Sequence, residues 1–291
     1  RNDKEEEKLM NNKSLGELRS TVMSKAFASG KPVYVASAKG AMIFDVDGNE
    51  YIDFNSGLVC LNVGHNHPKV VEAVKKQTDR YLHYSNTDFL YREVVDLAEK
   101  LTRLTQGDWE KRVFFGNSGA ESIEGAVKLA RWHTRRQLFI AFISAFHGRT
   151  MGAVSFTASK PVQRRHFFPL IPGVTHVPYA YCYRCPYKLT YPDCDLWCVD
   201  FIDEYVLQKY IPPEDTAAFV FEPIQGEGGY VVPPPEFFPR LKKLADKYGM
   251  LMVDDEVQAG MGRTGRFCAI ENWKIEPDVI CMSKSLASGM P

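Results

Sequence analysis

Titratable side chains follow two apolar runs near the end of this sequence. Asp254 and Asp255 come directly after the run at residues 250–253, and Lys284 comes soon after the run at 279–282. Two acids at the end of an apolar strand are expensive to bury without a partner, so we expect a fixed cation close to at least one of them. A lysine in such a place can lose its proton and act as a nucleophile. The simpler alternatives are an exposed turn for the acids and a solvated position for the lysine.

A segment of small residues follows another apolar run, "RVFF", at residues 112–115. In "GNSGAES", Ser118 can cap the helix that is predicted next, while Gly119 and Ala120 leave the backbone amides open to a ligand. Unpaired amides at the start of a helix favour an anion. The segment therefore predicts an anion site, with an ordinary helix cap as the alternative.

Other polar groups follow two more apolar runs. "AFHGRTMG" offers a flat ring in Phe146, an imidazole in His147 and a guanidinium in Arg149. "EPIQGEGG" places Glu222 and Glu227 near the same rim, and its glycines allow a turn. The ordinary alternative for Arg149 is an internal ion pair with an acid such as Glu222.

The glycines of "GMGRTG", at residues 260–265, match a dinucleotide-binding motif. That motif requires a strand that runs into the first glycine and a helix that starts at the last. The residues after Gly265 lack a helical apolar period and soon reach Pro277, and the acids Glu276 and Asp278 come too early for ribose binding. These features disfavour the dinucleotide interpretation.

The elements that must position these groups follow from the hydrophobic periodicity. Residues 40–54 alternate around the Asp47-Gly48 turn and predict a hairpin. Further along, apolar runs typical of strands alternate with helical periods. This order predicts an α/β fold with a mostly parallel central sheet and helices on both faces, in which ligands bind at the carboxyl ends of the strands. The expected strands are 112–115, 138–144, 174–179, 217–224, 250–257 and 278–284, and the expected helices are 67–84, 90–105, 121–133, 199–210 and 236–249.

Composition limits the class of partner. The 291 residues include 36 Lys and Arg and 36 Asp and Glu, and no basic stripe argues for nucleic acid. No apolar run is long enough for a membrane span, and the polar first thirty residues contain no apolar signal-peptide region. We expect a cytoplasmic protein with small-molecule partners and with neither nucleic acid nor membrane among them.

Four of the seven cysteines lie within one aromatic-rich segment. Their C-x-x-C and C-x-x-x-C spacings could hold a tetrahedral zinc ion. Disulfide bonds are a second interpretation, and a reduced surface excursion is a third. None of the three places the segment in catalysis, and no catalytic metal is expected. The cysteines are Cys182, Cys185, Cys194 and Cys198.

The groups at the predicted strand ends suit one cofactor, pyridoxal phosphate. Its phosphate needs helix amides, its ring needs a stacking face, its pyridine nitrogen needs a carboxylate and its aldehyde needs an amine. The segments "NSGAES", "FHGRTMG", "EPIQGEGG", "DDEVQAGMGRTG" and "SKSLASGMP", in this order and at these intervals, resemble the class III (omega-amino acid) aminotransferases, to which 4-aminobutyrate aminotransferases belong. The resemblance covers the chain from about "GAMIFDVDG" to the end, and it places "GMGRTG" in a loop after the pyridine-binding strand.

The resemblance implies a role for each matching residue. Lys284 would join the cofactor covalently, and Asp255 would pair with the pyridine nitrogen, with Asp254 as a neighbour only. Arg149 would bind the substrate carboxylate, and Glu227 would pair with a second arginine further along the family's sequence. The other cofactor residues would be Ser118, Gly119 and Ala120 at the phosphate, Phe146 on the ring, Gln258 at the ring hydroxyl and His147, and Leu58 would belong to the substrate site.

The resemblance also implies fold type I of the pyridoxal-phosphate-dependent transferases, assembled as a homodimer or a dimer of dimers. Residues 1–60 would form an N-terminal arm and the hairpin of a small domain. Residues 61–291 would form the large cofactor-binding domain, incomplete at its C-terminus, and the family's C-terminal small domain would be absent from this chain.

The implied activity is the ping-pong transfer of an amino group from an omega-amino acid, of the 4-aminobutyrate type, or a related amino acid to a 2-keto acid such as 2-oxoglutarate. Lys284 would act as the general base and acid. An amino acid racemase or aminomutase on the same scaffold would use the same residues, and a non-catalytic homologue would retain only the fold. These alternatives stay open at the level of sequence.

Overall fold

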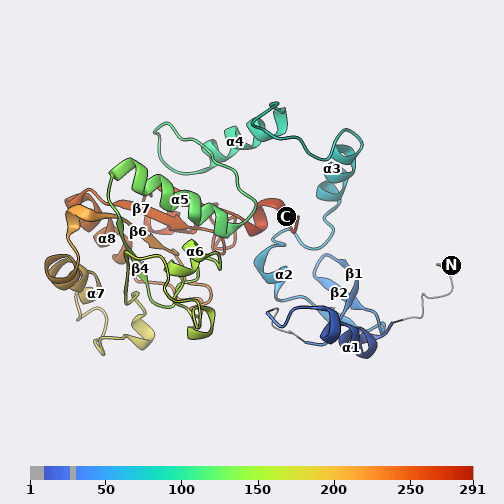
Figure 1. The fold of residues 1–291 in the computed structure, drawn as a ribbon, viewed down its shortest axis with the longest axis horizontal. Helices are drawn as coiled ribbons and strands as arrows, with labels where there is room; N and C mark the ends of the chain where they lie inside the picture. Colours follow the sequence, from blue (N-terminus) through green and yellow to red (C-terminus); the bar gives the residue numbers. More distant parts are fainter. Residues whose placement is uncertain (1–9, 27–30, 291) are drawn as a thin grey trace. The chain divides into compact units, whose positions relative to one another are not determined.

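The chain forms two compact units, residues 1–89 and residues 90–291 (Figure 1). The structure, a computed structural model, describes residues 10–26 and 31–290. The predicted N-terminal arm lies partly outside the described residues, and its described part contains helix α1 (Asn12–Val22). The predicted domain boundary after residue 60 stays a prediction.

A small antiparallel sheet forms in the first unit, with β2 between β1 and β3. β2 and β3 are the two arms of the predicted hairpin. Asp45 closes their turn, because its carboxylate accepts hydrogen bonds from the backbone N–H groups of Asp47 and Asn49. The predicted antiparallel segment is therefore confirmed, with β1 as an additional strand. The elements of this unit are β1 (Val35–Lys39), β2 (Met42–Asp45), β3 (Glu50–Ile52), α2 (Ser56–Val59) and α3 (Pro68–Thr78).

The second unit contains a five-stranded parallel sheet in the order β5-β4-β6-β7-β8. The central strand β6 lies between β4 and β7, so the residues that follow these three strands emerge side by side. The mostly parallel sheet is therefore confirmed. The strands are β4 (Leu138–Phe142), β5 (Val174–Val177), β6 (Thr216–Phe221), β7 (Leu251–Asp255) and β8 (Val279–Cys281).

Helices between the strands provide the crossovers that a parallel sheet requires. They are α6 (Met151–Phe156), α7 (Trp197–Phe201), which continues as the π-helical segment η3 (Ile202–Tyr210), and α8 (Phe237–Tyr248). Two further helices, α4 (Arg92–Leu104) and α5 (Gly119–Thr134), precede the first strand of this sheet. Short 3₁₀ turns are η1 (Pro161–Gln163), η2 (Cys182–Arg184), η4 (Pro213–Asp215), η5 (Ala269–Trp273) and η6 (Lys284–Ala287).

Alternate strand residues enter two separate apolar cores, one on each face of this sheet. On one face, Phe139 of β4 and Val253 of β7 share a buried cluster with Ile123 of α5. On the other face, Phe142 of β4 shares a buried cluster with Phe237 of α8. Helices therefore cover both faces, as the sequence predicted (Figure 1).

Residues 112–115 correct one prediction, because they form neither a strand nor a helix. Phe114 is 77% exposed, and its ring lies against α5 where a Cβ on Gly125 would approach it to 3.1 Å. A strand needs a neighbouring strand for its backbone N–H and C=O groups. At this edge of the sheet β8 pairs with β7 over three residues, and residues 112–115 do not add a further strand beside it. The apolar run alone was therefore an insufficient signal for a strand.

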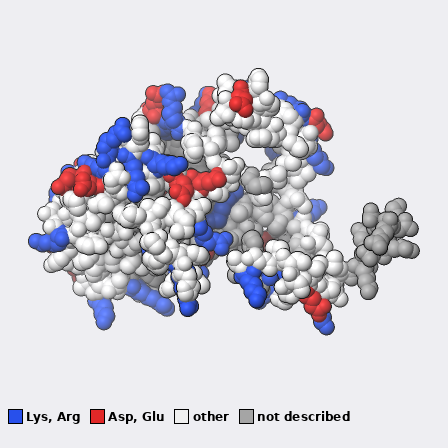
Figure 2. Space-filling model, viewed as in Figure 1, with Lys and Arg blue, Asp and Glu red and all other residues white. Residues whose placement is uncertain are grey.

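Lys and Arg side chains lie in mixed groups with Asp and Glu side chains on the face drawn in Figure 2. This mixture agrees with the equal totals of basic and acidic residues. Among the helices of residues 10–26 and 31–290, none is long and apolar enough to cross a membrane.

Candidate active site

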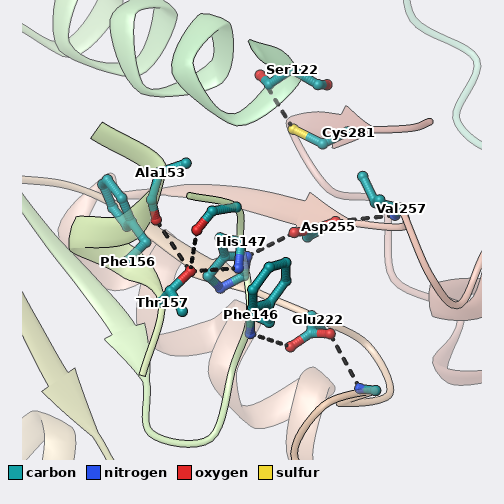
Figure 3. Close-up of polar contacts among 12 residues, drawn as sticks. Ser122, Phe146, His147, Ala153, Phe156, Thr157, Glu222, Asp255, Val257 and Cys281 are labelled. Atoms are coloured by element: carbon teal, nitrogen blue, oxygen red, sulfur yellow. Dashed lines mark hydrogen bonds and ion pairs between the residues drawn. The ribbon is translucent and has the colours of Figure 1, made fainter. Parts of the chain in front are cut away.

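A buried ion pair lies at the carboxyl end of β7. Asp255 Oδ2 lies 2.7 Å from Nδ1 of His147, and Asp255 Oδ1 accepts a hydrogen bond of 3.0 Å from the backbone N–H of Val257 (Figure 3). Asp255 is 3% exposed and His147 is 2% exposed. Burial opposes the imidazolium form, but the hydrogen bond and charge of Asp255 together with the charge of Glu222 raise the pKa of His147. His147 is therefore the basic partner that the sequence required beside one of the acids.

The loop after β4 holds His147 in place through Thr157, which sequence reasoning missed. Thr157 Oγ1 accepts a hydrogen bond from the His147 backbone N–H at 2.9 Å and donates one to the Gly148 carbonyl at 2.9 Å (Figure 3). Thr157 is fully buried. A threonine directly after a short apolar helix carries little functional signal by itself, so only its position beside the histidine reveals the contact.

The neighbouring acids of β7 point to the opposite face. Asp254 is fully buried, and neither of its carboxyl oxygens has a hydrogen-bond partner among the described residues. Burial, followed by the charge of Glu256, raises the pKa of Asp254 well above its ordinary value, and burial raises the pKa of Glu256 to about 7. Burial therefore disfavours the ionised form of Asp254, whereas Asp255 has a basic partner in His147.

The predicted anion site lies at the start of α5. The side chain of Ser118 accepts a hydrogen bond of 3.2 Å from the backbone N–H of Glu121 and so caps the helix. The N–H groups of Gly119 and Ala120 belong to the first turn, where no intrahelical acceptor exists. The cap and the anion site are therefore compatible, since the cap uses a different N–H group.

Close backbone contacts bring this helix start to the other strand ends. A Cβ on Gly119 would lie 3.0 Å from Val257 Cγ1 and 3.5 Å from Ser283 Cβ, beside Lys284. Gly148 has a φ of +127°, and a Cβ there would lie 2.8 Å from Ala120 Cβ. The segments after β4, β7 and β8 therefore meet at the start of α5, as predicted.

Lys284 and Gln258 occupy the loops that follow β8 and β7. Lys284 is partly buried in η6, with a φ of 41°, and its amine has no hydrogen-bond or ion-pair partner within the described ranges. Gln258 packs against the loop after β6, because a Cβ on Gly226 would lie 1.6 Å from Gln258 Oε1. Glycine is therefore required at position 226 while Gln258 holds this conformation.

The predicted substrate residues lie in more exposed surroundings. Arg149 is exposed, and the ion pair with Glu222 that we considered is not formed. Glu227 instead pairs with Lys160, whose Nζ lies 2.7 Å from Glu227 Oε2. Lys160 was missed because it stands in a polar turn with no motif. Leu58 belongs to the first unit, and its place in the substrate site stays a prediction.

The four clustered cysteines are free thiols in this structure. All four line a small cavity of about 20 Å³ together with aromatic side chains such as Tyr179 and Trp197. No set of three or more His, Cys, Asp or Glu side chains is arranged to hold a metal ion in the part of the chain that the structure describes. The zinc, disulfide and reduced interpretations of this segment stay predictions.

Sequence comparison connects this site to known proteins. The family model described as "Aminotransferase class-III" matches residues 25–291. A probable 4-aminobutyrate aminotransferase of Bacillus subtilis is 38% identical over 273 residues, which are 94% of this chain and 62% of that protein. A leucine/methionine racemase of Thermococcus litoralis is 38% identical over 260 residues, which are 89% of this chain and 58% of the racemase.

Structural comparison agrees. Taurine:2-oxoglutarate aminotransferase from Bifidobacterium kashiwanohense, solved in complex with PLP and glutamate, matches with a TM-score of 0.86 and 31% identity, covering 94% of this chain and 62% of that one. The chain thus spans less than two thirds of the length of these relatives. With its parallel sheet, its strand-end residues and the family match over residues 25–291, the chain belongs to the class III aminotransferases.

Proposed function

We propose that this protein binds pyridoxal phosphate and transfers an amino group from an omega-amino acid, of the 4-aminobutyrate type, to a 2-keto acid such as 2-oxoglutarate by a ping-pong mechanism. The observation that carries the proposal is the meeting of three features at the carboxyl end of the sheet. These are the Asp255–His147 pair, the unpaired N–H groups at the start of α5 and the free amine of Lys284. The similarity to named aminotransferases supports the same activity.

The residues present fit this cofactor. The N–H groups of Gly119 and Ala120, with Ser118, would hold the phosphate, and the glycine leaves room that a Cβ would fill. Asp255 would hold the pyridine nitrogen, and Lys284 would bond the aldehyde. Phe146 would cover the ring, Gln258 would reach the ring hydroxyl, and His147 would support Asp255 from behind.

The chain's own groups divide the work of the reaction. When bound, pyridoxal phosphate supplies a sink for the electron pair left when the carbon bearing the amino group loses a proton. His147 donates to Asp255 Oδ2 and so favours the carboxylate that keeps a proton on the pyridine nitrogen. Lys284 Nζ takes the proton from the substrate carbon and later returns a proton, a role worth about 10²–10⁴-fold in rate.

We assign substrate selection to the exposed residues. Arg149 provides a bidentate fork for a substrate carboxylate, and it has no competing ion pair in the described part of the chain. Glu227, paired with Lys160, lies on the neighbouring loop. We also assign Leu58 to the substrate site, and we propose assembly as a homodimer or a dimer of dimers. Cytoplasmic location stays a prediction from the sequence.

Absorbance and a substrate panel test the proposed function. Purified protein should bind pyridoxal phosphate with a visible absorbance band. Borohydride should abolish that band and leave the cofactor attached to Lys284 through a stable bond. A panel of amino donors with 2-oxoglutarate should then identify omega-amino acids as the preferred donors. A protein that takes up no cofactor would be the non-catalytic homologue instead.

A racemase is the second candidate, because a leucine/methionine racemase is as similar to this chain as the Bacillus protein. A single incubation with one enantiomer of an amino acid and no keto acid distinguishes the two activities. Inversion of the enantiomer without loss of amine would assign the racemase. No inversion, together with amine transfer once the keto acid is added, would assign the aminotransferase.

A further inference from the structure

Glu222 is a buried carboxyl for which the proposed mechanism has no use. It is the first residue after the central strand β6 and is 3% exposed. Because β6 lies between β4 and β7, the carboxyl stands between the loop that carries His147 and the strand end that carries Asp255. Such a group is costly to bury unless its hydrogen bonds are made.

Each oxygen of Glu222 binds a different loop. Oε2 accepts a hydrogen bond of 3.0 Å from the backbone N–H of Phe146, in the loop after β4. Oε1 accepts one of 3.2 Å from the backbone N–H of Gly226, in the loop after β6 (Figure 3). A carboxylate offers two acceptor oxygens, whereas an amide of the same shape offers one. Both oxygens of Glu222 are therefore used as acceptors, while burial raises the pKa of Glu222 to about 7.

The two loops that Glu222 joins carry the predicted contacts of the ring and the substrate. Phe146 is the proposed ring cover. Gly226 packs against Gln258, the proposed contact of the ring hydroxyl, and precedes Glu227 on the substrate side. A second contact joins the same loops, because Gln225 Nε2 donates a hydrogen bond of 2.9 Å to the Ile143 carbonyl. Only the Glu222 contact involves Phe146 itself.

We infer that Glu222 is a positioning residue that couples the ring-covering loop at Phe146 to the substrate-side loop at Gly226, so that both are held in register by one carboxylate. This inference rests on the proposed function for the roles of Phe146 and Gln258. The coupling itself is a property of the protein without cofactor. Glu222 touches neither the reacting carbon nor the proton that Lys284 moves.

Amide hydrogen exchange in the cofactor-free full chain tests the coupling. In Glu222→Ala, which removes both acceptors, exchange at residues 143–148 and at 225–228 should rise about tenfold. In Glu222→Gln, which keeps one acceptor, one of these segments should rise and the other should stay protected. The amides of β7 should keep their wild-type exchange in both variants. If Glu222→Ala fails to fold, the result for Glu222→Gln decides alone.

Glu271→Gln is the matched control. Glu271 Oε1 also accepts a backbone hydrogen bond, from Cys268 at 2.7 Å, but in η5. This variant should leave both segments unchanged. Unchanged exchange at both segments in the Glu222 variants would overturn the inference, and so would equal acceleration in β7, which would make Glu222 a general stabiliser of the sheet.

Cofactor binding separates this inference from the proposed function. If the wild-type protein binds pyridoxal phosphate, Glu222→Gln should raise the dissociation constant about tenfold, read from the visible absorbance, while Glu271→Gln should leave it unchanged. An unchanged constant in Glu222→Gln would overturn the role assigned to Glu222. Wild-type protein that binds no cofactor would overturn the proposed function, while the exchange measurement still tests the coupling.

Discussion

The two sides of the β7 strand end carry the same kind of residue in different surroundings. On the side of α5, Asp255 is paired with His147 and hydrogen-bonded to the backbone of Val257. On the other side, Asp254 and Glu256 are buried, and three of their four carboxyl oxygens have no hydrogen-bond partner among the described residues. Because side chains alternate along a strand, adjacent acids enter different surroundings.

This difference shows that a buried acid becomes useful for charge-based chemistry only where a partner stabilises its ionised form. Both sides are buried, but the ion-pair partner His147 lies beside Asp255 alone. On the far side, burial raises the pKa values of both carboxyls and so favours their protonated forms. Three consecutive acids thus provide one carboxyl paired with a histidine and two whose pKa values burial raises.

The largest effect should come from removing the amine on the α5 side. We expect Lys284→Ala to lower turnover by about 10⁴-fold or more, since both the covalent attachment and the proton transfer are lost. Its free energy of unfolding should change little, because Lys284 makes no polar contact within the described residues. Turnover assays and thermal melts check both statements, and retained turnover would remove Lys284 from the site.

Substituting each aspartate in turn tests the comparison directly. Asp255→Asn should lower turnover by about 10²–10³-fold, because a neutral side chain no longer holds the proton on the pyridine nitrogen. Asp254→Asn is the matched control and should stay within a few-fold of the wild type, since burial favours the protonated form of that carboxyl. Steady-state kinetics on both variants decide the assignment. A larger loss in Asp254→Asn would mean that the acids were assigned the wrong way round.

The buried carboxyl of Glu256 should make the free energy of unfolding depend on pH. The pKa of Glu256 is raised to about 7, so the folded state binds this proton more tightly than the unfolded state does. The resulting stability is present below the ordinary carboxyl pKa and is lost as pH rises through about 7, a loss of about 3 kcal/mol. Glu256→Gln should therefore gain stability relative to the wild type between pH 5 and pH 8.

Denaturant unfolding of both proteins at the two pH values measures this gain. The glutamine keeps an acceptor for the Ile270 N–H, which Glu256 Oε1 binds at 2.9 Å. If the free energies of unfolding of variant and wild type differ by the same amount at both pH values, burial does not raise the pKa of Glu256.

The smallest effect should come from the exposed rim, where solvent weakens every polar contact. Arg149→Lys should raise the Michaelis constant about tenfold for donors that carry a carboxylate, because lysine cannot reproduce the bidentate contact. Simple amines without that carboxylate should be nearly unaffected. Equal losses for both donor classes, with a lower melting temperature, would make Arg149 a scaffold residue.

Much of the second unit was predictable because long apolar periods have few alternatives. The parallel sheet, α5 and α8 follow from patterns in which strand and helix periods alternate. The predicted site residues Asp255 and Lys284 followed from their places at strand ends and from the family resemblance. The family match confirms that resemblance, and the residue roles stay predictions. The segment at 112–115 failed because an apolar run does not specify the partner that a strand requires.

Sequence by itself determined the order of the elements, the residue types at each strand end and the family. Only the tertiary structure decided which groups meet: His147 with Asp255, Glu222 with Phe146 and Gly226, and Lys160 with Glu227. The separations along the chain are 108, 76, 4 and 67 residues in turn. Local periodicity acts over a few residues, whereas the charge of a buried group depends on whichever distant segment the packing brings beside it.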